Sequence, residues 1–157
     1  KKIKSKNIIC IAPDVGGTER ARALGKLLNV GLAIVDKRRP KPGQSQVMNV
    51  IGNVKGKTCI IVDDIIDSGG TIINAAKALK DRGAKEVYVY ITHGVLSGEA
   101  VEKIKKSLIK NLVITDTIDN SEKLKKAKNI EVLPISGLMG EAIKRISNST
   151  SVSDLFK

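Results

Sequence analysis

Aromatic side chains are nearly absent from this chain of 157 residues: tryptophan is missing, and aromatic residues make up 2% of the sequence. Hydrophobic residues still account for 41%, so the core must be built from isoleucine, valine, leucine and alanine. Proteins that bind single-stranded nucleic acid stack bases on aromatic faces. This composition therefore argues against a nucleic-acid platform and favours a sheet covered by helices.

Cysteine is also scarce, and long apolar runs are missing. Cys10 and Cys59 lie in separate apolar segments without C-x-x-C spacing, which indicates buried thiols in a reducing, cytoplasmic compartment. No apolar run reaches the roughly 18 residues of a transmembrane helix, so we expect no membrane association. Residues 1–4 are basic and lack both a starting Met and an apolar signal core, so we expect the chain to be part of a longer polypeptide.

Acidic residues are outnumbered: 28 Lys and Arg stand against 16 Asp and Glu, which gives a net charge of +12. Such a balance suits nucleic acid, a membrane surface or a phosphorylated substrate. Much of the excess lies in lysine runs at 103–110 and 123–128, which contain no aromatic residue and are typical of solvated helix faces. We expect a phosphorylated small molecule as partner, and a basic nucleic-acid-binding module remains an alternative.

Strand-like and helix-like segments alternate along the chain. We expect strands at 7–12, 31–36, 46–51, 58–63, 86–92, 112–115 and 130–134. We expect helices at 18–28, with Thr18 as N-cap, and at 71–82, 98–108 and 138–146, followed by a polar tail. This order predicts a single α/β domain over residues 1–157, with a mostly parallel sheet flanked by helices on both faces.

Polar residues follow the ends of the predicted strands. Ligands of such sheets bind at the carboxyl ends of the strands. The residues concerned are Asp14, Asp36, Asp63, Thr92 and Asp116. We therefore expect them to form a polar rim on one edge of the sheet.

The segment 60–71, IIVDDIIDSGGT, is the most informative part of this rim. Asp63 and Asp64 suit sugar hydroxyls or a metal. Gly69 and Gly70 expose backbone N–H groups where a helix begins, which favours an anion. Around them, Ser68 and Thr71 offer hydroxyls, and Asp67 is expected to shape the loop through nearby backbone amides. An ordinary strand–turn–helix is the alternative, but the combination predicts a sugar phosphate, with ribose 5-phosphate as first candidate.

At this point a family resemblance is evident. The segment 62–71, VDDIIDSGGT, resembles the ribose-phosphate-binding signature of type I phosphoribosyltransferases. The wider pattern resembles ribose-phosphate diphosphokinase, the PRPP synthetase family, from about residue 7 to the C-terminus. Its motifs are APDVGG at 12–17, DKRRP at 36–40, VMN at 47–49, THGVLSG at 92–98 and TDTI at 115–118. The resemblance implies a phosphoribosyltransferase-like fold.

The resemblance also implies an activity. Enzymes of this family move the β,γ-diphosphoryl group of ATP to the 1-hydroxyl of ribose 5-phosphate, with Mg²⁺, giving PRPP and AMP. Asp63 and Asp64 would hold the ribose 2- and 3-hydroxyls, and the 5-phosphate would be held by Asp67, Ser68, Gly69, Gly70 and Thr71. Family members have two similar domains and assemble as hexamers. This chain resembles the C-terminal domain, so we expect weak ribose 5-phosphate binding and no PRPP synthesis without the N-terminal half.

Further roles come from the same resemblance. Lys37 and Arg39 match the catalytic pair, which suits a transfer that builds negative charge on phosphoryl oxygens; taken alone, they read as a solvated basic turn. Asp14 matches an aspartate that helps to hold the metal with a histidine of the N-terminal half, although its position also suits a loop cap. The tail residues Ser151, Val152 and Ser153 resemble a segment that lines an allosteric phosphate site between subunits. His93 could act as a general base, but a structural role is favoured.

Two rival functions share the loop. A phosphoribosyltransferase would use PRPP to modify a base and should carry a hood segment and a separate flexible loop, neither of which is found. A non-catalytic regulatory homologue would be expected to lose the basic pair, which Lys37 and Arg39 retain.

Overall fold

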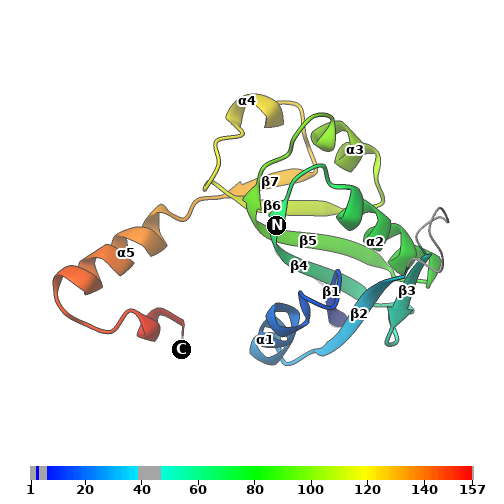
Figure 1. The fold of residues 1–157 in the computed structure, drawn as a ribbon, viewed down its shortest axis with the longest axis horizontal. Helices are drawn as coiled ribbons and strands as arrows, with labels where there is room; N and C mark the ends of the chain where they lie inside the picture. Colours follow the sequence, from blue (N-terminus) through cyan, green and yellow to red (C-terminus); the bar gives the residue numbers. More distant parts are fainter. Residues whose placement is uncertain (1–2, 4–6, 39–46, 157) are drawn as a thin grey trace.

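The computed structural model describes residues 3, 7–38 and 47–156, and these residues form one seven-stranded sheet with the order β3-β2-β1-β4-β5-β6-β7 (Figure 1). The strands are β1 (Ile8–Ala12), β2 (Gly31–Arg38), β3 (Val47–Ile51), β4 (Thr58–Ile66), β5 (Glu86–Gly94), β6 (Asn111–Thr115) and β7 (Ile130–Leu133). Every neighbouring pair is parallel except β2 with β3, which is antiparallel at one edge. The predicted mostly parallel sheet is confirmed.

Helices cover both faces of this sheet. The helices are α1 (Thr18–Leu28), α2 (Gly70–Asp81), α3 (Ala100–Lys106), α4 (Ser121–Leu124) and α5 (Ser136–Ser147), followed by a 3-10 helix, η1 (Ser153–Phe156). In α2 the predicted apolar stripe is buried, because Ile72, Ala75, Ala76 and Leu79 recur at helical spacing and pack on the larger core cluster. On the opposite face, Ala21 of α1 packs on Ala12 and Val62 in a smaller cluster.

The core is aliphatic, as the composition requires. Its largest fully buried side chains include Ile11, Ile61, Leu79 and Val89, all of which come from the sheet and α2. Cys10 and Cys59 are fully buried free thiols, which confirms their predicted location. Burial raises the pKa of the Cys59 thiol to about 11, against partial opposition from Lys57 and Lys80.

The C-terminal helix α5 extends away from the sheet (Figure 1). None of its residues is buried. Its exposed apolar side chains are Leu138, Met139, Ile143 and Ile146. The helix was predicted at 138–146, but its apolar side chains find no cover within the described part of the chain.

Several boundaries differ from those predicted. β4 continues to Ile66 because its pairing with β5 extends to Ile66 opposite Gly94, so Asp63 and Asp64 lie inside the strand rather than at its end. Thr18 is the first residue of α1 and not its N-cap; Gly17 precedes the helix and donates its N–H to Asp14 Oδ1 at 2.8 Å. Helices α4 and η1 were not predicted, because four-residue helices in polar sequence carry no apolar periodicity.

Among the described residues, no helix combines the length and the hydrophobicity that crossing a membrane requires.

Candidate functional site

The predicted polar rim is largely present where parallel strands end together. Asp14, after β1, and Asp63, in β4, line one pocket, and Asp63, Thr92 and Thr115 line a second. Asp36 lies inside β2 opposite Asn49 of β3 and lines neither pocket. The Asp116 carboxylate accepts an N–H from Ile135 at 2.9 Å, which anchors the start of α5. Asp63 therefore lies at the junction of two adjoining pockets.

The first pocket, of about 230 Å³, surrounds residues 67–71, which we call the phosphate loop. Gly69 has φ 79°, a left-handed conformation that glycine adopts without steric cost, and α2 begins at the next residue. In the part of the chain that the structure describes, no side chain caps α2, and the first turn of this helix contains no acidic residue. Since the first four N–H groups of a helix lack partners within it, this end of α2 is suited to receive an external anion.

The Asp67 carboxylate does not shape this loop. Among the described residues it makes no hydrogen bond, contrary to the prediction that it bonds to nearby amides. The loop's shape rests instead on the left-handed Gly69 and on the end of β4, where Ile66 O accepts N–H groups from Val95 at 2.9 Å and Leu96 at 3.2 Å.

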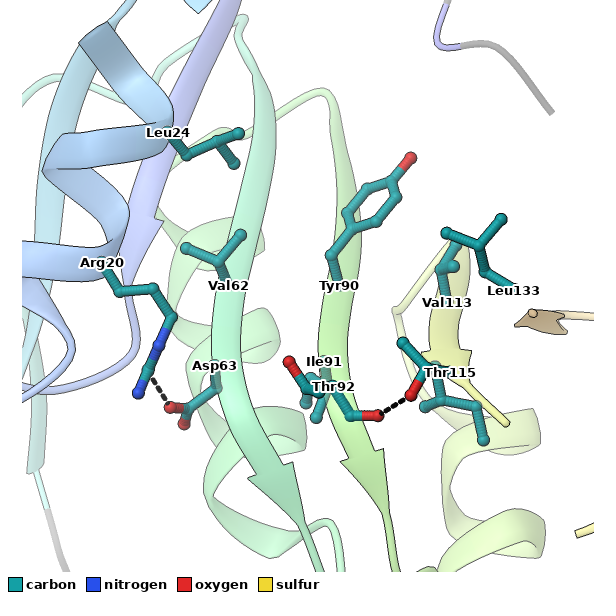
Figure 2. A pocket seen from close by; sticks show the side chains of 11 residues that line it. Arg20, Leu24, Val62, Asp63, Tyr90, Ile91, Thr92, Val113, Thr115 and Leu133 are labelled. Carbon is teal, nitrogen blue, oxygen red and sulfur yellow. Dashed lines mark hydrogen bonds and ion pairs between the residues drawn. The ribbon is translucent and has the colours of Figure 1, made fainter. Parts of the chain in front are cut away.

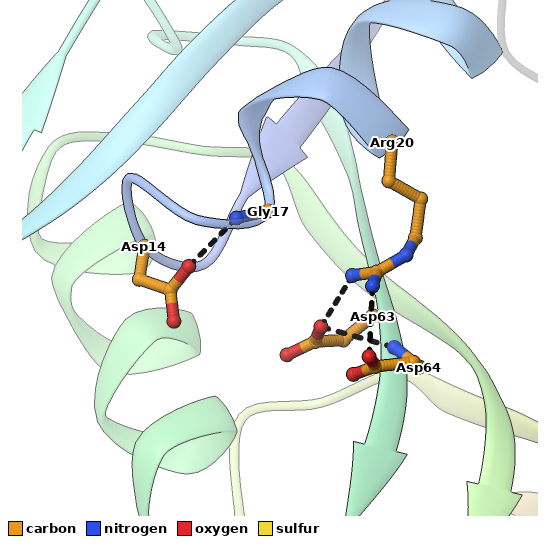
Figure 3. A network of polar contacts seen from close by, with 5 residues as sticks. All are labelled: Asp14, Gly17, Arg20, Asp63 and Asp64. Atoms are coloured by element: carbon orange, nitrogen blue, oxygen red, sulfur yellow. Dashed lines mark hydrogen bonds and ion pairs between the residues drawn. The ribbon is translucent and has the colours of Figure 1, made fainter.

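Asp63 and Asp64 are joined by an arginine that sequence reasoning missed (Figure 3). Arg20 of α1 places Nη1 2.6 Å from Asp63 Oδ1 and Nη2 2.9 Å from Asp64 Oδ2, and Asp64 N donates to Asp63 Oδ1 at 3.0 Å. One guanidinium thus offsets the repulsion between two adjacent carboxylates. The sequence did offer a signal for this contact. Arg20 lies in the first turn of α1, and α1 follows β1, the strand that pairs with β4.

The two carboxyl groups differ electrostatically. Burial raises the pKa of Asp63, despite the opposing charge of Arg20. For Asp64, partial desolvation is outweighed by the Arg20 guanidinium and by hydrogen bonds, and its pKa falls below the usual range. The side chains are 20% and 60% exposed, so Asp64 is the more accessible to a ligand. The pair offers carboxylate oxygens that can accept hydrogen bonds from the two hydroxyls of a diol.

The second pocket, of about 290 Å³, extends from Asp63 across the sheet beside α1 (Figure 2). Arg20 and Asp63 lie at one end, and apolar side chains, including Leu24, Val62 and Tyr90, form its floor. At the rim, Thr115 Oγ1 donates to Thr92 O at 2.7 Å. This pocket places an apolar surface beside the polar one.

His93 lies on β5 beside this rim. Its Nδ1 is 2.9 Å from Thr117 Oγ1, which connects it to the turn after β6. Thr117 Oγ1 also donates to Thr92 O at 3.3 Å. His93 thus belongs to a polar network between the ends of β5 and β6.

Asp14 is the candidate metal ligand. Its Oδ1 accepts the Gly17 N–H, which gives it the loop-capping contact anticipated as an alternative. Within the described ranges no cluster of three or more His, Cys, Asp or Glu side chains is placed to hold a metal. Mg²⁺ commonly binds through one or two carboxylates together with substrate phosphates and waters. A carboxylate beside the phosphate loop fits such a substrate-held ion, and not an all-protein cage.

The remaining candidates lie away from the pockets. Lys37 is placed through its backbone only, in β2 opposite Met48, and Arg39 lies outside the described residues. In the tail, Ser151 Oγ is 2.9 Å from Ser153 Oγ, and Arg145 Nη1 donates to Ser151 O at 2.9 Å. Val152 is the half-buried residue between these serines.

Comparison with known proteins gives this arrangement a context. A curated ribose-phosphate pyrophosphokinase of Hyphomonas neptunium is 62% identical over 150 residues, covering 95% of this chain and 48% of the relative. That of Bradyrhizobium diazoefficiens is 60% identical over 146 residues, covering 93% and 46%. The chain therefore spans about half the length of the curated relatives it matches.

Solved structures give the same picture. The phosphoribosylpyrophosphate synthetase of Mycobacterium smegmatis superposes with a TM-score of 0.82 at 35% identity, over 91% of this chain and 46% of that one. An APRTase from Giardia lamblia, complexed with 9-deazaadenine, superposes with a TM-score of 0.58 at 16% identity, over 71% and 70%. The second likeness concerns the fold alone, and that fold is the phosphoribosyltransferase fold predicted from the sequence.

Residues 37–157 match the phosphoribosyl synthetase-associated domain, and the chain belongs to that family. The resemblance to ribose-phosphate diphosphokinases that the motifs suggested is thereby confirmed.

Proposed function

We propose that this chain is the C-terminal half of a ribose-phosphate diphosphokinase, in which it supplies the ribose 5-phosphate site. The observation that carries the proposal is the meeting, on one sheet edge, of an uncapped helix N-terminus and a pair of carboxylates. The first accepts a phosphate and the second accepts hydroxyls. Ribose 5-phosphate presents both groups at opposite ends of a small ring.

In the proposed reaction, O1 of ribose 5-phosphate forms a bond to the β-phosphorus of ATP while the bond between that phosphorus and the α,β-bridging oxygen breaks. AMP leaves, and the proton of the 1-hydroxyl is released. Residues 67–71 would hold the 5-phosphate, and Asp63 and Asp64 the 2- and 3-hydroxyls. Rigid fixation of the sugar at both ends orients O1 for attack, which is the main contribution a protein makes to such a transfer.

Charge neutralisation would come from other groups. Lys37 and Arg39 are the proposed catalytic pair, because positive charge stabilises the diphosphoryl group as its bond to the leaving AMP breaks. Asp14 would hold Mg²⁺ together with phosphate oxygens of the substrate, and the ion when bound would neutralise further charge there. The residues that bind the adenine of ATP belong to the proposed N-terminal half, so the isolated chain should bind ribose 5-phosphate and form no PRPP.

We propose further that the complete protein is a cytoplasmic homo-oligomer, a hexamer by family resemblance, with a phosphate effector held near Ser151, Val152 and Ser153. Helix α5 supports the proposed oligomer. Its apolar side chains Met139, Ile143 and Ile146 are at least half exposed, and such exposed apolar groups are typical of surfaces that bind another polypeptide. The tail that carries the serines follows α5 directly.

Titration of the chain with ribose 5-phosphate in the presence of Mg²⁺ tests the proposed site. Asp63→Asn keeps the shape of the side chain and removes one of the two charged acceptors proposed for the ribose hydroxyls, so its affinity should fall by about tenfold, equivalent to about 1.4 kcal/mol. Calorimetry measures both dissociation constants. Equal affinity of the two proteins would refute the diol-binding role of Asp63.

A matched control is Asp81→Asn, a carboxylate on the far end of α2 that lines neither pocket. Its affinity should match that of the wild type. An assay of AMP formation completes the test, since robust turnover by the isolated chain would contradict the need for an N-terminal half.

A further inference from the structure

A short segment at the end of β5, residues 94–98, holds the entrance to the phosphate loop. Two of its N–H groups, from Val95 and Leu96, converge on Ile66 O at 2.9 Å and 3.2 Å. Ile66 is the last residue of β4 and the next residue is Asp67, the first of the loop. The position of this carbonyl therefore sets the direction in which the chain enters the loop.

The segment itself is under conformational constraint. Leu96 has φ 50° although it is not glycine, and its side chain is 1% exposed. Left-handed conformations of branched, non-glycine residues persist only where their surroundings enforce them. Something outside the segment must therefore keep it in place.

Two side chains from the region of α4 provide such contacts. Asn120 Nδ2 donates to Gly94 O at 2.7 Å and to Ile118 O at 3.2 Å. Lys123 Nζ lies 3.3 Å from Val95 O and 3.4 Å from Leu96 O. Three consecutive carbonyls of the segment thus accept hydrogen bonds from this region, while its amides bond to Ile66.

Asn120 is unusual in its burial. It is 4% exposed, and its Oδ1 is buried with no partner among the described residues. Most buried polar atoms are paired, and an unpaired one carries a cost. The amide orientation is fixed by the two carbonyls that Nδ2 meets, so the side chain serves as a donor. Its burial is explained by the contact with Gly94 O.

We propose that Asn120 and Lys123 are positioning residues for the phosphate loop, acting through residues 94–98 and Ile66. Neither residue lines either of the two pockets. They fix the segment that fixes Ile66 O, and they thereby orient the amides of Gly69 and Gly70 toward the phosphate. This inference rests on the proposed role of the loop in holding the 5-phosphate of ribose 5-phosphate.

The test compares two variants with two matched controls in the 157-residue chain. Asn120→Ala and Lys123→Met remove the two sets of donors. Asn129→Ala removes an asparagine that also donates to two carbonyls, Ile104 O at 3.3 Å and Ile109 O at 3.5 Å. This asparagine lies near the amino-terminal ends of β6 and β7, at the end of the sheet away from the phosphate loop. Lys125→Met removes a lysine of the same region that pairs with Glu122 at 2.7 Å.

Two readouts are measured. Calorimetry with ribose 5-phosphate and Mg²⁺ should show an affinity loss of about tenfold for Asn120→Ala and about threefold for Lys123→Met, with controls within about twofold of the wild type. Hydrogen exchange should show faster exchange at the Val95 and Leu96 amides in the two variants, because the segment is released.

The outcomes separate this inference from the function on which it rests. If the wild type fails to bind ribose 5-phosphate, the proposed function fails. Exchange at the Val95 and Leu96 amides still shows whether Asn120 and Lys123 hold residues 94–98 in place. If the wild type binds and Asn120→Ala binds equally well, the inference is overturned. It is also overturned if Asn129→Ala weakens binding as much, since the effect would then reflect general stability. If Asn120→Ala does not fold, Lys123→Met takes its place, and unchanged affinity of this variant would overturn the inference.

Discussion

Two strand-to-helix turns lie side by side at the carboxyl ends of β1 and β4. They differ in the acidic groups placed at the N-terminus of the helix that follows. The turn from β1 into α1 carries its own anion: Asp14 Oδ1 accepts the Gly17 N–H at 2.8 Å, and Glu19 lies in the first turn of the helix. Within the described residues, no side chain caps the first-turn amides of either helix, and the first turn of α2, unlike that of α1, contains no acidic residue.

The difference explains which turn is available to a ligand. A helix N-terminus attracts negative charge, and acidic groups of the same chain can supply part of it. At α1 the Asp14 carboxylate accepts one backbone N–H, that of Gly17, and Glu19 adds negative charge in the first turn. At α2 the first turn has no acidic residue, which leaves its amides available to an external phosphate. The turn before α1 and the turn before α2 both contain Asp and Gly, but only the second is proposed to bind a phosphate.

The largest expected effect comes from the glycine that shapes the open turn. Gly69→Ala would place a side chain at φ 79°, where the cost for a non-glycine residue is about 1–2 kcal/mol. Space is adequate, since the nearest atom to the new Cβ is Ile73 Cδ1 at 3.5 Å. We expect chemical denaturation to show this loss of stability, with a roughly tenfold weaker affinity for ribose 5-phosphate.

The other turn supplies the control for this variant. Gly16→Ala meets Asp14 Oδ1 at 3.4 Å and requires no left-handed backbone, so its stability should change by less than about 0.5 kcal/mol. A comparable loss in both variants would show that the two turns do not differ in the way described.

A smaller effect is expected from the carboxylates of the two turns. Asp14→Ala removes the contact with Gly17 N and should lower the unfolding free energy by about 1 kcal/mol, as loss of one hydrogen bond commonly does. Asp67→Ala removes a side chain that makes no hydrogen bond within the described residues, so stability in the absence of ligand should hardly change. Denaturant titration of both variants at neutral pH measures the contrast, and equal losses would contradict it.

Sequence alone predicted the local parts of this site. The phosphate loop and the strands before it are contiguous, so their apolar pattern and glycines identify them. The contacts that sequence reasoning missed join segments that lie far apart in the chain. Arg20 meets Asp63 across 43 positions and Asn120 meets Gly94 across 26, and no local pattern encodes either pairing. The role given to Asp67 was wrong for a related reason, since the loop is held from β5 and not by its own side chain.

Arg20 connects α1 to the two carboxylates of β4, and its removal should lower stability by less than removal of the Asp14 carboxylate does. The folded-state pKa of Asp64 lies below its ordinary value of 3.8, so this group adds stability above about pH 3.8 and loses it as pH falls through the folded pKa. Asp63 has a raised pKa, so its contribution has the opposite sign: it is present at low pH and lost as pH rises through the folded value.

Arg20 favours the ionised form of both groups. Arg20→Met should therefore raise both pKa values and reduce stability at neutral pH. The side chains of Arg20 and Asp64 are 41% and 60% exposed, so solvent screening limits the loss to about 0.2–1 kcal/mol. The difference from the wild type should shrink as pH falls through the Asp64 pKa and Asp64 becomes protonated. Denaturation at a series of pH values, with Arg22→Met of the same helix as control, measures it. A difference that is independent of pH would show that Arg20 acts through packing and not through the two carboxylates that join the turns.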